Sequence, residues 1–223
     1  MPLISHRGAA HLAPANSLEA IKLGDSFKPA FVEVDINCTL DGQLIVYHGS
    51  VQRFLRGKRT KEKLGEIQSA EPHIMTLGEF LKIKIKSPYL FDIKVTETDL
   101  LSKISDEISK INRRDFGFTS PHEKALIFMK KAFPDSIIFQ SQPYHHGPVT
   151  ALEIARKNKF EGIALNKWWL TPFVYKLCAM HGKKIMSYTI DSKIGIWLAH
   201  KIFPNAYITT NRPDIYRKMF PND

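Results

Sequence analysis

The chain has 223 residues, which is enough for one domain and just enough for a barrel of eight βα units. Apolar residues make up 43% of it, so a large core can form, and two cysteines, Cys38 and Cys178, are too few for a disulfide scaffold. The net charge of +10 favours anionic partners, but no RNA-binding or zinc-finger motif accompanies it, which argues against nucleic acid.

No signal peptide is recognisable in residues 1–8, and no apolar run approaches the roughly 18 residues of a membrane span. We therefore expect a cytoplasmic protein. The basic residues are scattered apart from a denser stretch, Arg53–Lys63. A solvated surface is the ordinary interpretation of such a pattern, and weak contact with an anionic membrane surface is compatible with it.

Short β-rich runs alternate with helical patterns along the whole chain. The expected strands are 2–5, 31–36, 89–94, 116–119, 136–140, 162–165, 184–189 and 206–210. The expected helices are 17–25, 76–83, 100–111, 122–133, 149–157, 172–181 and 194–202. Alternating βα units predict a parallel sheet, and eight of them predict an α/β fold closed as a (β/α)8 TIM barrel. A doubly wound open sheet is the alternative.

One connection departs from the βα pattern. Asp41-Gly42 lies between two β-rich runs, which indicates a hairpin after the second strand. The polar, basic residues that follow offer few clear core positions. We interpret residues 49–75 as a short insertion at the top face of a single domain spanning 1–223.

The second strand carries two acids on one face. In a strand, Glu33 and Asp35 point to the side opposite Val34, and burying two carboxylates requires a compensating cation or hydrogen bonds. If Asp41 and Gly42 form a two-residue loop, residue 40 pairs with 43, and His48 lies opposite Asp35.

The next barrel strand places Asp92 and Lys94 on a shared face. If it neighbours the second strand, three carboxylates and a lysine converge at one end of the barrel. Ligation by oxygen alone suits a hard cation, Mg²⁺ or Ca²⁺. The alternative is a structural network of salt bridges.

Taken in order, several motifs resemble the signature of the glycerophosphodiester phosphodiesterase family. They are His6-Arg7-Gly8, Pro14-Ala15-Asn16-Ser17, Glu33-Val34-Asp35, Thr39-Leu40-Asp41-Gly42 and His48, followed by the segments FDIK, MTLGEFL and AYITTNRPD. The resemblance covers essentially the whole chain. It implies a TIM barrel that hydrolyses glycerophosphodiesters to glycerol 3-phosphate and an alcohol.

The resemblance also implies a role for each matched residue. Glu33, Asp35 and Asp92 would hold the divalent cation, and His6 and His48 would form the acid/base pair. Contacts to the substrate would come from Arg7, Lys94 and Tyr188. The departures from the family pattern are Ala15 for glutamate, Asp92 for glutamate, Gly49 for aspartate and Tyr188 for tryptophan.

Several alternatives stay open. Phospholipase D-like hydrolysis of lysophospholipids by the same site is suggested by Arg53–Lys63 and by Trp168-Trp169, although core packing is the favoured interpretation of the two tryptophans. A barrel that binds phosphate ligands without catalysis is the third reading. Arg7 could pair with a carboxylate, and Asn16-Ser17 reads as a helix N-cap. The oligomeric state, the head group and the native cation are left open.

Overall fold

A computed structural model of the chain describes residues 1–49, 56–142 and 146–223. Within these residues eight parallel strands close a barrel, because β1 hydrogen-bonds with both β9 and β2. The remaining order is β9-β8-β7-β6-β5-β4-β2, so the predicted barrel is confirmed over an open sheet. The strands are β1 (Leu3–Ser5), β2 (Phe31–Cys38), β3 (Leu44–Val46), β4 (Tyr89–Ile93), β5 (Phe116–Ser120), β6 (Ile137–Ser141), β7 (Gly162–Asn166), β8 (Lys184–Tyr188) and β9 (Tyr207–Thr210).

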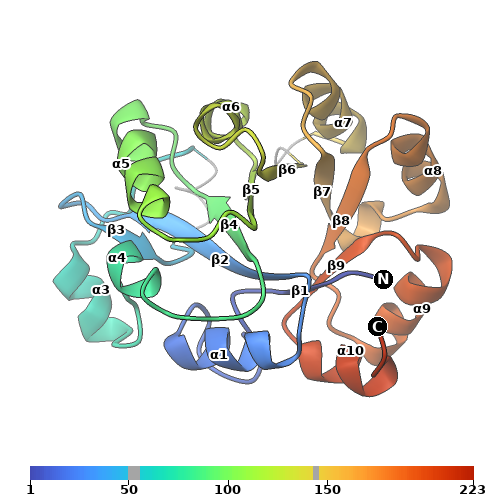
Figure 1. The fold of residues 1–223 in the computed structure, drawn as a ribbon, viewed down its shortest axis with the longest axis horizontal. Coiled ribbons are helices and arrows are strands. Elements are labelled where there is room, and N and C mark those ends of the chain that lie inside the picture. The colour runs from blue at the N-terminus through green and yellow to red at the C-terminus, as the bar shows by residue number, and fades with distance from the viewer. Residues whose placement is uncertain (50–55, 143–145) are drawn as a thin grey trace.

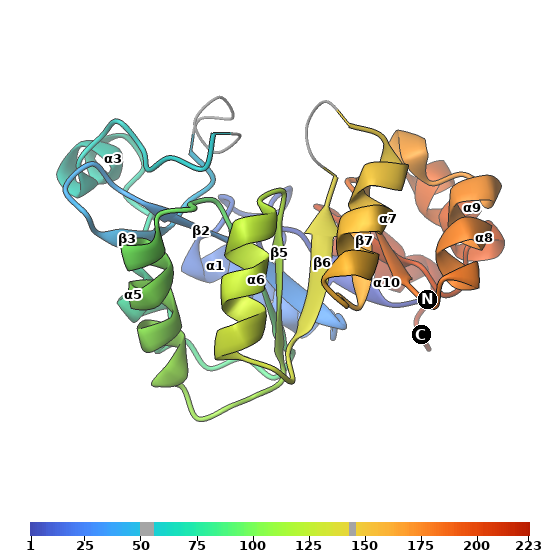
Figure 2. The ribbon, with the colours of Figure 1, turned by 90° about the horizontal axis from the view of Figure 1, so that it is seen from above.

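The helices form a ring around the strands (Figure 1), and α5, α6 and α7 lie side by side along one flank (Figure 2). In the described part of the chain they are α1 (Leu18–Ser26), α3 (Leu64–Ala70), α4 (Leu77–Phe80), α5 (Thr98–Ser109), α6 (Glu123–Ala132), α7 (Pro148–Lys157), the 3₁₀ helix η1 (Lys167–Trp169), α8 (Pro172–Met180), α9 (Lys193–Ile202) and α10 (Pro213–Met219). The prediction omitted α3, η1 and α10. Among the described residues, no helix combines the length and the apolar composition needed to cross a bilayer.

Capping residues set where several helices begin. The side chains of Ser17, Thr171 and Ser192 accept backbone N–H groups at the starts of α1, α8 and α9. Pro172 follows its cap at the first position of α8, where a missing N–H costs nothing. The helix predicted at 76–83 is shorter than expected, because the N–H of Ile83 bonds to the carbonyl of Phe80 in a 3₁₀-type turn.

The barrel separates two apolar layers. Alternate residues of β2, such as Val32 and Val34, point outward and pack with the helices in the larger core. A smaller cluster fills the barrel interior and includes Leu90, Phe139 and Met186. Both cysteines are buried and unpaired, as expected. The interior positions next to the carboxyl ends of β2 and β4 are polar, and there the site begins.

The predicted insertion at 49–75 follows β3, and its residues 50–55 lie outside the described part, as does the first portion of the basic stretch Arg53–Lys63. The remainder includes α3. Core positions are few there, as expected: in the described part of the insertion only Ile67 and Ile74 are buried apolar residues, and both pack against Ile45 of β3. These residues form a separate small core, because α3 packs on the hairpin instead of the barrel wall.

Candidate active site

The turn after β1 depends on a glycine, Gly8, that packs closely against α1. The N–H of His6 donates to the carbonyl of Thr210 at 3.0 Å, which extends the sheet by one residue. Arg7 and Gly8 then adopt φ values of +50° and +80°. A Cβ on Gly8 would lie 2.4 Å from the carbonyl carbon of Ala20, so only glycine lets α1 approach this turn. The turn thereby fixes His6 and Arg7 at the carboxyl end of β1.

The three predicted acids converge, as the strand pattern indicated. Parallel pairing places Asp35 beside Asp92, and Glu33 lies two residues before Asp35 on the same inward face. One oxygen from each carboxylate lies within 4.8 Å of the others. Glu33 and Asp35 are 4% and 1% exposed, so the acids are buried beneath the barrel mouth.

Two cations neutralise part of this charge. Lys94 bridges two acids, with its Nζ 2.9 Å from Asp35 Oδ1 and 2.5 Å from Asp92 Oδ2. The Nε of Arg7 lies 3.0 Å from Asp35 Oδ2. Burial alone would raise the pKa of Asp35, but Lys94 and Arg7 hold it well below its ordinary value. Arg7 therefore contacts a carboxylate, the alternative that the sequence left open.

Asn16 is a residue whose place the sequence did not reveal. Its Nδ2 donates to Asp35 Oδ2 at 2.9 Å, and its Oδ1 accepts the N–H of Asp35 at 3.3 Å. Ser17 caps α1 by itself, so the N-cap interpretation was right for Ser17 and wrong for Asn16. The φ of Asn16 is +62°, a conformation that asparagine tolerates better than most residues, and this preference was the only local signal.

The charge that remains fits a divalent cation. Three carboxylates face two cationic side chains, and the Oδ1 of Asp92 is buried with no hydrogen-bond partner among the described residues. Burial, together with the carboxylates of Asp35 and Asp92, raises the pKa of Glu33 well above its ordinary value. The all-oxygen donor set suits a hard cation, and a double charge would offset the surplus of acid.

His6 is oriented by a chain of hydrogen bonds from the loops that follow β9 and β8. Its Nδ1 lies 2.7 Å from Oδ1 of Asn211, whose Nδ2 donates to Asp191 at 2.8 Å. Because the amide oxygen only accepts, Nδ1 carries the proton of the neutral ring and Nε2 presents its lone pair. Burial and the adjacent Arg7 lower the pKa of His6 to about 4. Asn211 lies in the segment NRPD of the resemblance, but its spacing gave no hint of this contact.

The hairpin register differs from the prediction by one residue. Ile36 pairs with Val46, and the N–H of Tyr47 donates to the carbonyl of Asp35 at 3.0 Å, so Tyr47 lies opposite Asp35. The loop has three residues, 40–42, and ends on Gly42 with φ +83°. That geometry is typical of a three-residue hairpin loop, whose last residue is left-handed.

His48 still reaches the site, because it follows the last paired residues of the hairpin. Its Nδ1 lies 3.0 Å from the carbonyl of Gly49, and Asn37 donates to the carbonyl of His48 at 3.2 Å. Burial lowers the pKa of His48, although Asp35 opposes this shift. Gly49 has φ +69°, and a Cβ there would lie 2.9 Å from Asn37 Nδ2. The left-handed φ, more than this contact with the end of a side chain, favours glycine at a position where the resemblance leads us to expect aspartate.

A cavity of about 390 Å³ opens above these groups. Of the eight predicted site residues, Asp35 lies beneath it and the other seven line it: His6, Arg7, Glu33, His48, Asp92, Lys94 and Tyr188. Trp168, Trp169 and Met186 also contribute to its wall. The favoured core packing of the tryptophans was wrong, since they are 79% and 43% exposed. Burial raises the pKa of Tyr188 to about 12, so its hydroxyl stays protonated and can donate.

Solved structures with the same fold are found across distant organisms. A provisionally named glycerophosphodiester phosphodiesterase from Galdieria sulphuraria aligns with TM-score 0.84 and 19% identity, covering 100% of this chain and 98% of that one. A phosphodiesterase from Oleispira antarctica, in complex with the product sn-glycerol-3-phosphate, aligns with TM-score 0.82 and 17% identity over 100% and 97% of the two chains. A glycerophosphodiester phosphodiesterase from Parabacteroides distasonis aligns with TM-score 0.78 and 18% identity, covering 98% of this chain and 95% of that one. At these identities the similarity establishes the fold.

The sequence itself carries the family assignment. A comparison with curated proteins finds no match. The model of the glycerophosphoryl diester phosphodiesterase family matches residues 6–214, a span that begins at His6 and includes every side chain of the cavity described above. The chain therefore belongs to the glycerophosphoryl diester phosphodiesterase family and is an enzyme of the phosphodiesterase class.

Proposed function

We propose that this protein hydrolyses glycerophosphodiesters to glycerol 3-phosphate and an alcohol, in a reaction that depends on a divalent cation. The observation that carries the proposal is the convergence of two histidines, three acids and two cationic side chains at one cavity. The family assignment supports it, as does the product bound to the similar Oleispira antarctica phosphodiesterase. A cavity of this size suits a small phosphodiester.

Glu33, Asp35 and Asp92 would hold the cation, Mg²⁺ or Ca²⁺. When bound, such an ion offsets the negative charge that accumulates on the phosphoryl oxygens. Lys94 and the backbone of Arg7 keep the acids in place, since the N–H of Arg7 donates to Glu33 Oε2 at 2.8 Å. Asp92 is shorter than the family's glutamate, and its unsatisfied Oδ1 is the oxygen best placed to accept a further positive group.

The two imidazoles would move the protons. His6 is the better candidate for the base, because Asn211 keeps the proton on Nδ1 and burial keeps the ring neutral at neutral pH. Its Nε2 would accept the proton of the attacking hydroxyl, from water or from the glycerol moiety itself. His48 would protonate the leaving alcohol; burial lowers its pKa overall, and the carboxylates of Asp35 and Asp92 oppose that shift in favour of the imidazolium.

Arg7, Lys94 and Tyr188 would contact the substrate. All three line the cavity. Arg7 can offer guanidinium N–H groups to a phosphoryl oxygen while its Nε stays beside Asp35. The protonated hydroxyl of Tyr188 would take the place of the family's tryptophan on the substrate side, and it adds a hydrogen-bond donor that an indole would present elsewhere.

Release of glycerol 3-phosphate from glycerophosphocholine tests the proposal. The wild type should release product with Mg²⁺, Ca²⁺ or Mn²⁺, and a chelator should abolish release until the cation is restored. Asp92→Asn should weaken the response to added cation, whereas Asp106→Asn on α5 provides a matched control. Full turnover in chelator would refute the cation role. Tight binding without turnover for any cation would favour the non-catalytic barrel.

A second candidate is supported by the apolar wall of the cavity. Trp168, Trp169 and Met186 provide a surface on which an acyl chain could lie, so lysophospholipids are alternative substrates for the same site. The assay is release of choline from micellar lysophosphatidylcholine. Turnover of glycerophosphocholine with none on the lysolipid would eliminate this candidate.

A further inference from the structure

The outer face of α8 is apolar where a barrel helix would ordinarily meet water with polar residues. Phe173 and Met180 are seven residues apart on this face, and each is 72% exposed. Lys176 lies between them on the same face. The helix buries Val174 and Cys178 on its inner side, so the exposed apolar residues are not needed to hold it against the barrel.

The neighbouring helix α9 repeats the arrangement. Ile194, Trp197 and Ile202 lie on its outer face and are 73%, 47% and 48% exposed, with Lys201 among them. The inner side of α9 buries Ile196 and Ala199. Two consecutive helices therefore each have an apolar stripe directed toward the barrel and a second one directed toward solvent.

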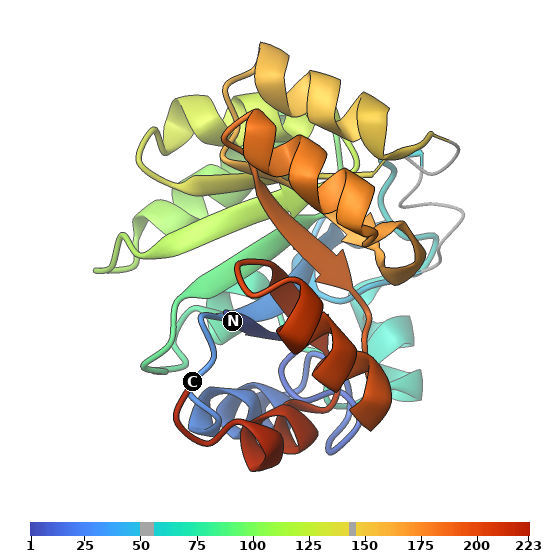
Figure 3. The ribbon, with the colours of Figure 1, turned by 90° about the vertical axis from the view of Figure 1, so that its right-hand side faces the viewer.

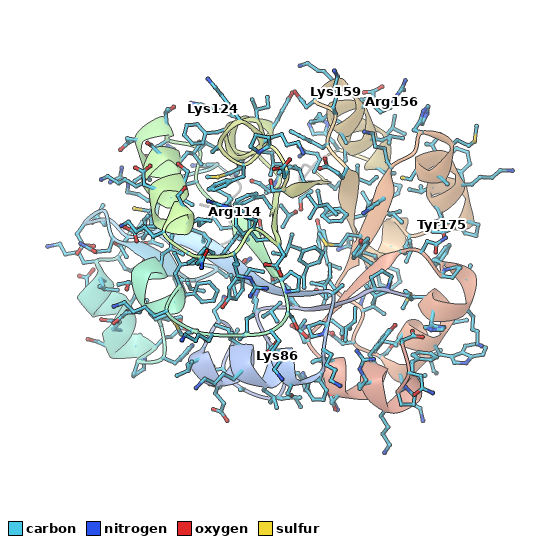
Figure 4. All side chains as sticks on the ribbon, viewed as in Figure 1. Lys86, Arg114, Lys124, Arg156, Lys159 and Tyr175 are labelled. Atoms are coloured by element: carbon cyan, nitrogen blue, oxygen red, sulfur yellow. The ribbon has the colours of Figure 1, made fainter. Side chains whose placement is uncertain are left out.

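The helices α8 and α9 lie on the same side of the molecule, the side that Figure 3 shows. Tyr175 of α8, labelled in Figure 4, connects α8 to the end of α9. Its ring lies 5.3 Å from that of Phe203, and its hydroxyl accepts the N–H of Asn205. Trp168 of η1 lines the cavity. We call the exposed side chains Trp168, Phe173, Met180, Ile194, Trp197 and Ile202 the α8–α9 face.

Two features of the sequence identify what this face fits. All three tryptophans of the chain, at 168, 169 and 197, lie on it or at its edge, and tryptophan favours the boundary between water and lipid. The helices α8 and α9 themselves contain three lysines, Lys176, Lys193 and Lys201, and no acid. An apolar surface with basic residues around it is typical of proteins that bind anionic membranes.

We propose that the α8–α9 face docks on a lipid surface containing anionic head groups, with its apolar side chains in the interfacial layer and Lys176 and Lys201 on the lipid phosphates. The cavity mouth would then lie at the edge of the docked surface. A second copy of the chain fits less well, because a symmetric contact would bring two basic surfaces together without acids between them. The proposal stands apart from the reaction, since docking requires no turnover.

Sedimentation with vesicles of phosphatidylcholine, with and without phosphatidylserine, tests the docking. The wild type should bind the anionic vesicles, lose binding as salt is raised, and show a blue shift of tryptophan fluorescence. The triple variant Phe173→Ser, Ile194→Ser, Trp197→Ser should bind at least about tenfold more weakly. Lys176→Gln and Lys201→Gln should each reduce binding about fivefold.

Matched controls come from other faces. Ile127→Ser removes an isoleucine that is 45% exposed on α6, and Lys124→Gln removes a lysine from the same helix (Figure 4); neither should change binding. Circular dichroism and thermal unfolding show that the variants fold. No binding to either vesicle, or equal binding by the triple variant, would overturn the proposal. Equally tight, salt-independent binding to neutral vesicles would overturn the anionic assignment. A dimer that the triple variant dissociates would assign the face to a second copy.

Discussion

Two regions of the molecule, the charged end of the barrel and the α8–α9 face, are built on opposite principles. The charged sector is formed by the carboxyl ends of β1, β2 and β4, and its acidic and basic side chains are paired with one another. Asp35, for example, has three partners: Arg7, Asn16 and Lys94. In the α8–α9 face, large apolar side chains such as Phe173 and Ile194 project into solvent. The first sector buries the groups that water would stabilise, and the second exposes the groups that water disfavours.

This difference between the charged sector and the α8–α9 face indicates which region is suited to catalysis and which to binding a partner. Buried charges persist only when their neighbours fix them, so the charged sector is rigid and its geometry is specific. The exposed apolar residues contribute little to the fold, because α8 and α9 are already anchored by inner residues such as Val174 and Ile196. Mutations should therefore separate the two sectors by kind: activity and stability in one, surface binding in the other.

The largest effect is expected from the loss of His6, the proposed general base. His6→Ala should lower kcat for glycerophosphocholine by roughly a thousandfold, because it removes the group that we propose accepts the nucleophile's proton. The exposed His11→Ala is the control and should leave the rate unchanged. The assay is release of glycerol 3-phosphate, with thermal unfolding to verify the fold. A rate within tenfold of wild type would remove His6 from the proton transfers.

Removing the positive charge of Lys94 should lower the stability of the fold more than any change on the α8–α9 face. Lys94→Met leaves Asp35 and Asp92 buried with less compensation and should lower the free energy of unfolding by about 3 kcal/mol. Phe173→Ser should change it by no more than about 0.5 kcal/mol. Urea denaturation in chelator compares the two. Equal stabilities would mean that the charged sector relaxes without its lysine.

Asn211 is expected to act through His6. Asn211→Ala removes the acceptor that fixes the proton on Nδ1 and should lower kcat by about ten- to a hundredfold with little change in KM. The same hydrogen bond raises the pKa of His6 against the effect of burial, so the acidic limb of the rate profile should move to lower pH. Nitrogen NMR of the imidazole reads the tautomer directly. An unchanged tautomer and pH profile would leave Asn211 with a structural role alone.

Replacing Glu33 should change the stability of the fold in the opposite direction from replacing Lys94. Glu33→Gln keeps an oxygen for the N–H of Arg7 but removes a carboxylate crowded by two others, so the protein in chelator should be more stable by about 1 kcal/mol. With cation present the advantage should disappear, because the variant binds the ion less well. Thermal unfolding with and without Mg²⁺ makes both comparisons. Loss of stability in chelator would mean that Glu33 stabilises the fold in its ionised form.

A pH effect is also expected at the amino end of β4, away from the charged sector. Although burial alone would raise the pKa of Asp25, the N–H groups of Ser87 and Lys86 hold it below its ordinary value. Its contribution is therefore complete at neutral pH, shrinks as the pH falls below about 4, and is lost below the folded-state pKa. Asp25→Asn should cost about 1 kcal/mol at pH 7 and less at low pH. A cost independent of pH in urea titrations would assign it to packing.

Much of this was readable from the chain. The alternation of β-rich and helical runs predicted the closed barrel, and the period of two placed Glu33 and Asp35 on one face, because side-chain direction in a strand depends on local geometry alone. The positions 6, 33, 35, 48 and 92 followed from ordered motifs. The tryptophans at 168 and 169 were misjudged, since local pattern does not tell a buried apolar residue from an exposed one.

What only the tertiary structure decided lies in contacts between distant segments. The hairpin register depended on a three-residue loop ending at Gly42, and a shift of one residue exchanges the faces of a strand. The contacts of Asn16 with Asp35, of Asn211 with His6 and of Tyr175 with Phe203 join residues that no sequence spacing relates. The sequence by itself determined which chemical groups are present and on which strand faces they lie. Closure of the barrel determined which of them meet, because it brings the carboxyl ends of β1, β2 and β4 to one rim.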